Sequence, residues 1–151
     1  MVDEDCIIAS NHLRQSYQNK TLRITIMPTQ ACNFSCWYCY ENHHASKMDT
    51  DAVDAIFSFI KNETNRKNIR RVVLDWFGGE PLLYFYQVIY PLSKAVKEWA
   101  EESGLKFSNM ITTNGALITD EMAKLMDAVR LFSFQITLDG NREHGTVFNK
   151  L

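Results

Sequence analysis

Residues 22–40 read LRITIMPTQACNFSCWYCY and hold the two features that decide the fold. Leu22, Ile24 and Ile26 alternate with more polar residues, which predicts a β-strand over 22–29. Directly after this strand, three cysteines follow one another in the spacing C-x3-C-x2-C. A strand that runs straight into such a loop is typical of βα folds, which place their active sites at the carboxyl ends of parallel strands.

The rest of the chain repeats this unit of strand, loop and helix. Three further strands are expected, near residues 70–77, 107–113 and 131–138. Apolar stripes at helical spacing separate them, at residues 53–60, 92–99 and 122–129. Thr50 and Asp51 are candidate starts of the first helix, Pro91 suits the first turn of the second, and Thr119 is a candidate N-cap of the third. Alternating strands and helices predict an α/β protein with a parallel sheet and right-handed crossovers.

The length limits which parallel fold the chain can form. A closed (β/α) barrel usually takes about 250 residues. This chain has 151 residues and ends soon after the fourth expected strand, so its units form only about half of such a barrel. A doubly wound open sheet is the alternative. We expect either a fragment of a longer protein or a sheet whose open edge is covered by another chain.

The charge and hydropathy of the sequence limit which kinds of binding partner and which cell compartment are expected. Sixteen Lys and Arg against eighteen Asp and Glu give a formal charge of −2, which predicts neither a nucleic acid nor an anionic membrane as partner. No apolar run approaches the roughly 18 residues of a spanning helix. The acidic start at residues 3–5 is opposite in charge to a signal peptide, so we expect a cytoplasmic protein. In a reducing compartment, clustered cysteines indicate a metal or catalytic site.

Three thiolates on one short loop can converge on a single metal centre. Cys32, Cys36 and Cys39 suit a 4Fe–4S cluster, in which three cysteine ligands leave one iron open to an external ligand. Zinc is the alternative, because His43 follows Cys39 with three residues between and would complete a tetrahedral set. The spacing by itself leaves both metals open.

The cysteine loop resembles the cluster loop of the radical S-adenosylmethionine (SAM) superfamily, and three further motifs occur in the order that this family shows. They are Gly78-Gly79-Glu80-Pro81, Thr112-Thr113-Asn114-Gly115 and Gln135-Ile136-Thr137-Leu138-Asp139-Gly140. Four motifs in this order favour the iron–sulfur cluster over zinc. The resemblance covers about residues 22–145. It implies a partial (β/α) barrel of the radical SAM type with outer helices, truncated after the fourth strand, in which 1–21 is an N-terminal extension and 22–151 is half of the core domain.

The resemblance also implies how the first two motifs act. Cys32, Cys36 and Cys39 would hold the cluster, and SAM would chelate the fourth iron. Tyr38 is expected against the adenine of SAM, with core packing as the alternative.

The glycines of the GGEP motif, Gly78 and Gly79, let the backbone approach a ligand, and Pro81 completes the motif. A backbone carbonyl and the Glu80 carboxylate are expected to accept hydrogen bonds from the SAM ammonium, with a tight turn and a solvated glutamate as the alternative. The remaining candidates carry hydroxyl, amide or carboxylate groups that suit the ribose and carboxylate of SAM. They are Thr113, Asn114, Gln135, Thr137 and Asp139, the last of which also suits a turn.

By the same resemblance, SAM is reductively cleaved to methionine and a 5′-deoxyadenosyl radical, which abstracts a hydrogen from the substrate. An external electron donor such as flavodoxin or ferredoxin is implied. The motifs are most similar to the subgroup that modifies peptides and proteins, which includes sulfatase-maturating enzymes and ribosomal-peptide maturases of the SPASM type. We therefore expect a peptide or protein substrate, although the auxiliary-cluster cysteines and later strands of that subgroup are not in this sequence. The alternative is a non-catalytic truncated module that binds a cluster, zinc or a leader peptide.

Overall fold

The computed structural model describes residues 20–136, in which four strands alternate with helices. In chain order the elements are β1 (Thr21–Ile26), α2 (Thr50–Lys67), β2 (Arg71–Trp76), the 3-10 helix η1 (Pro81–Tyr84), the π-helix η2 (Phe85–Ile89), α3 (Tyr90–Glu102), β3 (Lys106–Thr112), α4 (Asp120–Ala128) and β4 (Leu131–Gln135). The sheet order is β1-β2-β3-β4 and every pairing is parallel. The expected alternation of parallel strands and helices is confirmed.

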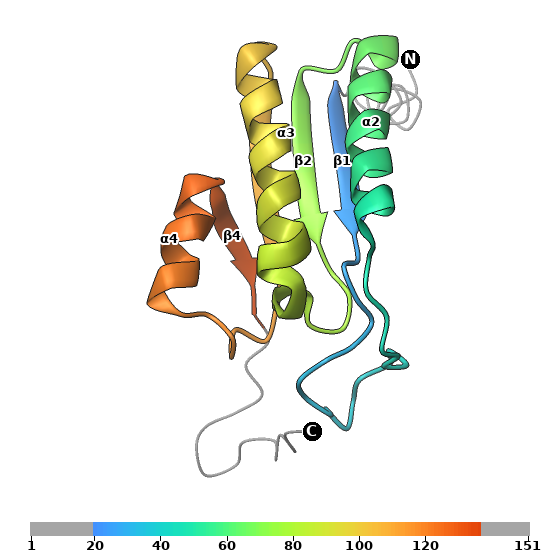
Figure 1. Ribbon diagram of the computed structural model, residues 1–151, viewed down its shortest axis with the longest axis vertical. Coiled ribbons are helices and arrows are strands. Elements are labelled where there is room, and N and C mark those ends of the chain that lie inside the picture. The colour runs from blue at the N-terminus through green and yellow to red at the C-terminus, as the bar shows by residue number, and fades with distance from the viewer. Residues whose placement is uncertain (1–19, 137–151) are drawn as a thin grey trace, which may run out of the picture.

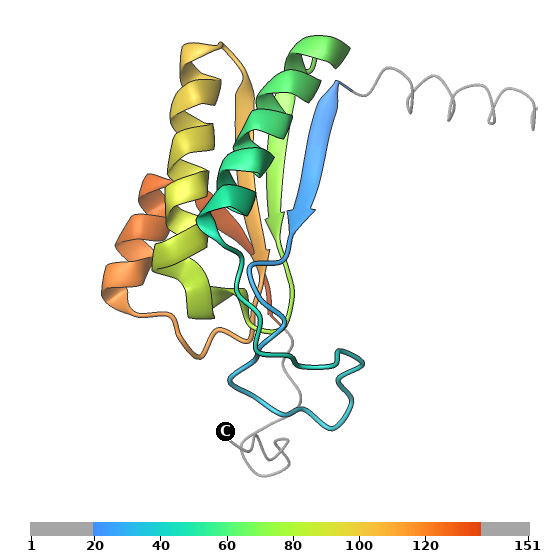
Figure 2. The same cartoon turned by 45° about the vertical axis from the view of Figure 1, so that its right-hand side comes forward.

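The helices lie on one face of the sheet, as Figures 1 and 2 show. The strands run in the same direction, and the long segment 27–49 extends from their carboxyl ends before the chain enters α2. The same views show no helix on the opposite face for the part of the chain between residues 20 and 136. This arrangement leaves the carboxyl edge of the sheet to the loops that carry the predicted motifs.

The core forms between the helices and the facing side chains of the sheet. Because strand side chains alternate between faces, Leu74 and Trp76 point to the helices, where both are completely buried. Trp76 Nε1 donates a hydrogen bond to Asn109 Oδ1 at 2.8 Å, and Asn109 Nδ2 donates to the Val129 carbonyl at 3.2 Å. The side-chain polar atoms of Trp76 and Asn109 are thus paired, which avoids the cost of burying them alone, whereas the buried hydroxyls of Thr64 and Ser93 have no partner.

The helix starts agree with the sequence. Thr119 caps α4 as expected, because its hydroxyl accepts a hydrogen bond from the Met122 amide, and Pro91 lies in the first turn of α3. α2 begins at Thr50, one of the two expected starts, and its N-cap is the preceding residue Asp49, since Asp49 Oδ1 accepts from the Ala52 amide at 2.8 Å. Each of these three residue types is a good start, so the local sequence does not choose between them.

β1 and β4 end earlier than expected, and β2 is one residue shorter than expected at each end. The first ends at Ile26, and Pro28, which lies beyond it, has no N–H to donate to a neighbouring strand. β4 ends at Gln135, and its pairing with β3 shifts register between Asn109 and Met110. Residues 137 and 138 of the expected strand lie outside the described residues. None of the helices described is long and apolar enough to cross a membrane.

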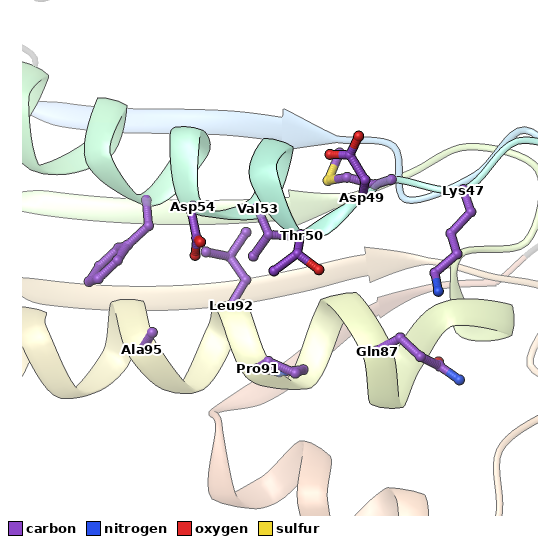
Figure 3. A pocket seen from close by; sticks show the side chains of 11 residues that line it. Lys47, Asp49, Thr50, Val53, Asp54, Gln87, Pro91, Leu92 and Ala95 are labelled. Atoms are coloured by element: carbon purple, nitrogen blue, oxygen red, sulfur yellow. The ribbon is translucent and has the colours of Figure 1, made fainter.

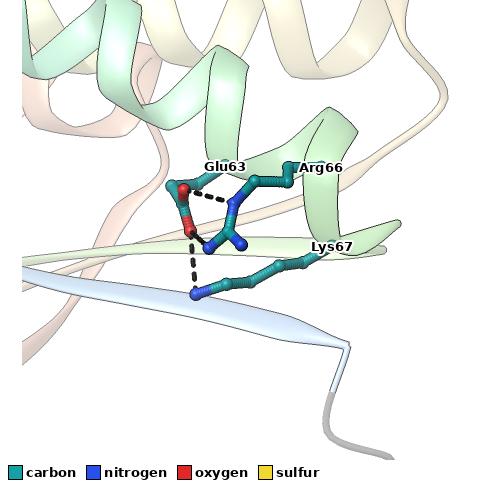
Figure 4. Close-up of polar contacts among 3 residues, drawn as sticks. All are labelled: Glu63, Arg66 and Lys67. Carbon is teal, nitrogen blue, oxygen red and sulfur yellow. Dashed lines mark hydrogen bonds and ion pairs between the residues drawn. The ribbon is translucent and has the colours of Figure 1, made fainter.

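The carboxyl end of α2 carries a compact ion cluster (Figure 4). Glu63 accepts hydrogen bonds from Arg66 Nε and Arg66 Nη2, each at 2.8 Å, and Lys67 Nζ lies 2.8 Å from Glu63 Oε2. The two cations lower the pKa of Glu63 to about 2. They also offset the unfavourable placement of a carboxylate near the negative end of a helix.

Candidate functional site

The cysteine loop leaves β1 at the carboxyl edge of the sheet and turns back on itself. The Cys39 amide donates to the Cys36 carbonyl at 3.0 Å, which closes a tight turn between these two cysteines. The Phe34 amide donates to Cys32 Sγ at 3.4 Å. All three thiols are free; Cys32 and Cys36 are half-buried, and Cys39 is exposed. Three free thiols on one turn-containing loop fit the thiolate donor set of an iron–sulfur cluster.

The thiols are near enough to influence one another. Burial raises the pKa of Cys32, the Phe34 N–H lowers it, and the negative charges of Glu80, Cys36 and Cys39 raise it further. Within residues 20–136, no three His, Cys, Asp or Glu side chains are already gathered as a metal site. His43, the fourth ligand of the zinc alternative, has its Nδ1 3.1 Å from the Gln30 carbonyl. Both ligand sets therefore stay predictions.

The GGEP loop lies directly against the cysteine loop. The Gly79 amide donates to the Thr29 carbonyl at 3.2 Å, and the Glu80 amide donates to the Ala31 carbonyl at 2.8 Å. A Cβ on Gly78, whose φ is +120°, would overlap the Thr29 carbonyl oxygen, and one on Gly79 would overlap that of Ala31. The glycines are thus required by the close approach of the chain's own backbone. The approach to a ligand that the sequence suggested stays a prediction.

Glu80 is completely buried, and its carboxylate joins the GGEP loop to the end of β3. Oε1 accepts hydrogen bonds from the Leu82 amide at 2.9 Å and from Thr113 Oγ1 at 2.7 Å, and Oε2 accepts from the Asn114 amide at 2.8 Å. Burial raises the pKa of Glu80, and the three hydrogen bonds lower it. The alternative of a solvated glutamate is wrong. The predicted contact with the SAM ammonium stays a prediction.

Asn114 carries the connection on to the cysteine loop. Its Nδ2 donates to Asn33 Oδ1 at 2.8 Å and lies 3.9 Å from Cys32 Sγ. The motifs around Cys32, Glu80 and Asn114 are therefore one continuous set of contacts. Sequence reasoning missed Asn33, whose only signal was its place beside the first cysteine of the motif.

The other predicted residues lie around this set or beyond it. Pro81 is buried at the start of η1. Tyr38 is 43% exposed, and its ring packs edge-to-face against that of Trp37, with 5.6 Å between the ring centroids. Gln135 is exposed at the end of β4, where its carbonyl accepts from the Thr113 amide at 3.1 Å. Thr137 and Asp139 lie outside the described residues. Partial exposure leaves Tyr38 and Gln135 accessible to a ligand.

A separate groove of about 480 Å³ lies between α2 and α3 (Figure 3). Val53 and Asp54 on α2 face Pro91 and Leu92 on α3, and Lys47 lies at one end. No predicted site residue lines this groove. It lies between two of the helices that cover one face of the sheet, and at one end it reaches Lys47, Met48 and Asp49 of the 27–49 segment.

Comparison with known proteins places this arrangement in a family. The family model for the radical SAM superfamily matches residues 26–150. The chain belongs to the radical SAM superfamily. Members of this superfamily typically use a 4Fe–4S cluster and SAM, and the present domain is related to peptide-modifying maturases.

Individual relatives agree with this membership. The chain is 29% identical over 140 residues to a serine-type anaerobic sulfatase-maturating enzyme of Bacteroides thetaiotaomicron, and the match covers 87% of this chain and 32% of that enzyme. Two solved structures share the fold at 24% identity: anSMEcpe with bound AdoMet, and anSMEcpe with AdoMet and the Cp18Cys peptide. Their TM-scores are 0.71 and 0.69, and the matches cover 86% and 83% of this chain and 35% and 33% of those chains. The expected radical SAM partial barrel is confirmed, and the chain spans about a third of the length of these relatives.

Proposed function

We propose that this radical SAM domain binds a 4Fe–4S cluster and SAM, cleaves SAM reductively, and thereby modifies a peptide or protein. The observation that carries the proposal is the contact between three motifs at one edge of the sheet. Glu80 binds Thr113 and Asn114, and Asn114 binds Asn33 next to Cys32. These loops come from three different strands, and a cofactor seated among them would touch all three.

Each residue has a proposed task in this site. Cys32, Cys36 and Cys39 hold the cluster, and their negative charge attracts the sulfonium of SAM. When bound, the cluster and SAM supply the electron transfer and the radical. A backbone carbonyl of the GGEP loop and the Glu80 carboxylate would accept hydrogen bonds from the ammonium group of SAM. The residues proposed to line the rest of SAM are Tyr38, Pro81, Thr113, Asn114, Gln135, Thr137 and Asp139.

Two lines of support favour a peptide as substrate. The relatives include sulfatase-maturating enzymes, and anSMEcpe has been solved with a bound peptide. In this chain, polar pairs lie on the sheet face away from the helices: Arg23 Nη1 lies 3.3 Å from Asp75 Oδ2, and Arg71 Nη1 donates to Ser108 Oγ at 3.0 Å. A surface of charged and hydroxyl groups suits the amides of a peptide chain. An external electron donor of the flavodoxin or ferredoxin class completes the proposal.

The test is an anaerobic assay of the full chain after reconstitution with iron and sulfide. With dithionite as reductant, the proposal predicts that SAM is converted to 5′-deoxyadenosine and methionine. A reconstituted brown protein that never cleaves SAM would contradict the catalytic proposal. A colourless protein with one zinc per chain would instead support the alternative of a non-catalytic module.

A further inference from the structure

The side-chain amide of Asn114 is held in one orientation by its own surroundings. Its main-chain N–H donates to the buried carboxylate of Glu80 at 2.8 Å, which fixes the backbone. Its Oδ1 accepts from the Ala116 amide at 3.0 Å. An amide oxygen accepts and an amide nitrogen donates, so the oxygen has to face the Ala116 N–H. The Nδ2 group therefore points toward the cysteine loop.

The two N–H bonds of that nitrogen have two acceptors within reach. Asn33 Oδ1 lies 2.8 Å from Asn114 Nδ2, and Cys32 Sγ lies 3.9 Å away. Cys32 Sγ also accepts from the Phe34 amide at 3.4 Å, so N–H groups approach this sulfur from two segments of the chain. Both Cys32 and Asn33 are half-buried, which limits competition from water for these contacts.

We propose that Asn114 is a positioning residue, which donates a hydrogen bond to Cys32 Sγ and thereby raises the reduction potential of the iron–sulfur cluster held there. This inference rests on the proposed function. One-electron reduction by the external donor adds negative charge, part of which lies on the ligand sulfurs. An N–H donor at a sulfur stabilises that added charge, and hydrogen bonds to the sulfurs are a recognised control of cluster potential. Asn33 assists by holding the Asn114 amide and the Cys32 backbone together.

The chain offers a matched pair of substitutions for the test. Asn114→Asp removes the donor, retains an oxygen for the Ala116 amide, and adds one negative charge near Cys32. Asn33→Asp adds the same charge beside Cys32, and its carboxylate still accepts from Asn114 Nδ2. Both variants therefore add a negative charge near Cys32, but only Asn114→Asp loses the N–H donor to Cys32 Sγ. Asn114→Leu removes the donor without adding charge, and Asn62→Leu is its control at an exposed position on α2.

The measurement is the midpoint potential of the reconstituted full-length chain without SAM, from a redox titration followed by electron paramagnetic resonance. We expect a more negative potential for Asn114→Asp than for Asn33→Asp, and a more negative potential for Asn114→Leu than for the wild type or Asn62→Leu. Equal potentials for Asn114→Asp and Asn33→Asp would overturn the inference, and this pair decides the question if Asn114→Leu does not fold. A wild-type chain that takes up no iron would instead overturn the proposed function, and the inference with it.

Discussion

Thr113 Oγ1 donates a hydrogen bond of 2.7 Å to the carboxylate of Glu80, across 33 residues of sequence. The same hydroxyl accepts from the Gly115 amide at 3.0 Å, so it fixes the turn after β3 as well. Because Glu80 is completely buried, its carboxylate has no water to bind, and the hydrogen bonds from Leu82, Thr113 and Asn114 offset the cost of burying it. The relative position of the GGEP loop and the TTNG turn follows from this contact.

Glu80→Gln tests that dependence. Glutamine retains one oxygen for Leu82 and Thr113, but its NH₂ group then faces the Asn114 N–H, donor against donor. An unpaired buried polar group costs about 1–3 kcal/mol, so we expect the unfolding free energy to fall by about that amount. Urea denaturation measures the change. Glu102→Gln at an exposed position is the control, and a Glu80→Gln midpoint equal to that of the control would contradict the prediction.

Gly79→Ala tests the contact between the GGEP loop and the cysteine loop. The added Cβ would overlap the Ala31 carbonyl oxygen, so the cysteine loop has to move. We expect a loss of about 1–3 kcal/mol of stability, as for other overpacked sites, and a lower iron content after reconstitution. Gly104→Ala is the matched control: its φ is +67°, but no atom lies within 4 Å of the added Cβ. Equal iron content in the two variants would argue against this account.

Glu63→Gln tests the ion cluster at the end of α2. The folded-state pKa of Glu63 is lowered to about 2 from an ordinary value of 4.5, so its contribution to stability is fully present above pH 4.5. That contribution is lost as the pH falls from 4.5 to 2. The difference in unfolding free energy between the wild type and Glu63→Gln should therefore shrink across this range. A difference that stays constant between pH 5 and pH 2 would show that the ion pairs do not act on stability.

The alternation of strands and helices along the chain could be predicted, because the strands and helices carry local sequence patterns. Leu22, Ile24 and Ile26 alternate within β1, and the hydroxyl of Thr119 marks the start of α4. The helical turns of η1 and η2 before α3 were not predicted. Glu80 caps η1 and Pro81 opens it, but both belong to the motif expected as a turn, and the residues after them form a mostly apolar run that does not distinguish a strand from a helix.

The contacts within the site could not be predicted in the same way. The motif pattern identified Glu80, but its hydrogen bonds reach Thr113 and Asn114 on another loop. Such partners depend on how parallel strands of different length end beside one another, which local sequence does not encode. The same reason explains why Asn33 was missed: its partner Asn114 lies 81 residues away.

The claim that Cys32, Cys36 and Cys39 hold an iron–sulfur cluster is tested by the iron content of the chain after anaerobic reconstitution. Cys36→Ala removes one proposed ligand, and Cys6→Ala is the matched control outside the motif. We predict about four irons per chain for the wild type and for Cys6→Ala, and loss of the cluster in Cys36→Ala. A wild-type chain without iron, or a Cys36→Ala chain with the iron content of the wild type, would contradict the claim.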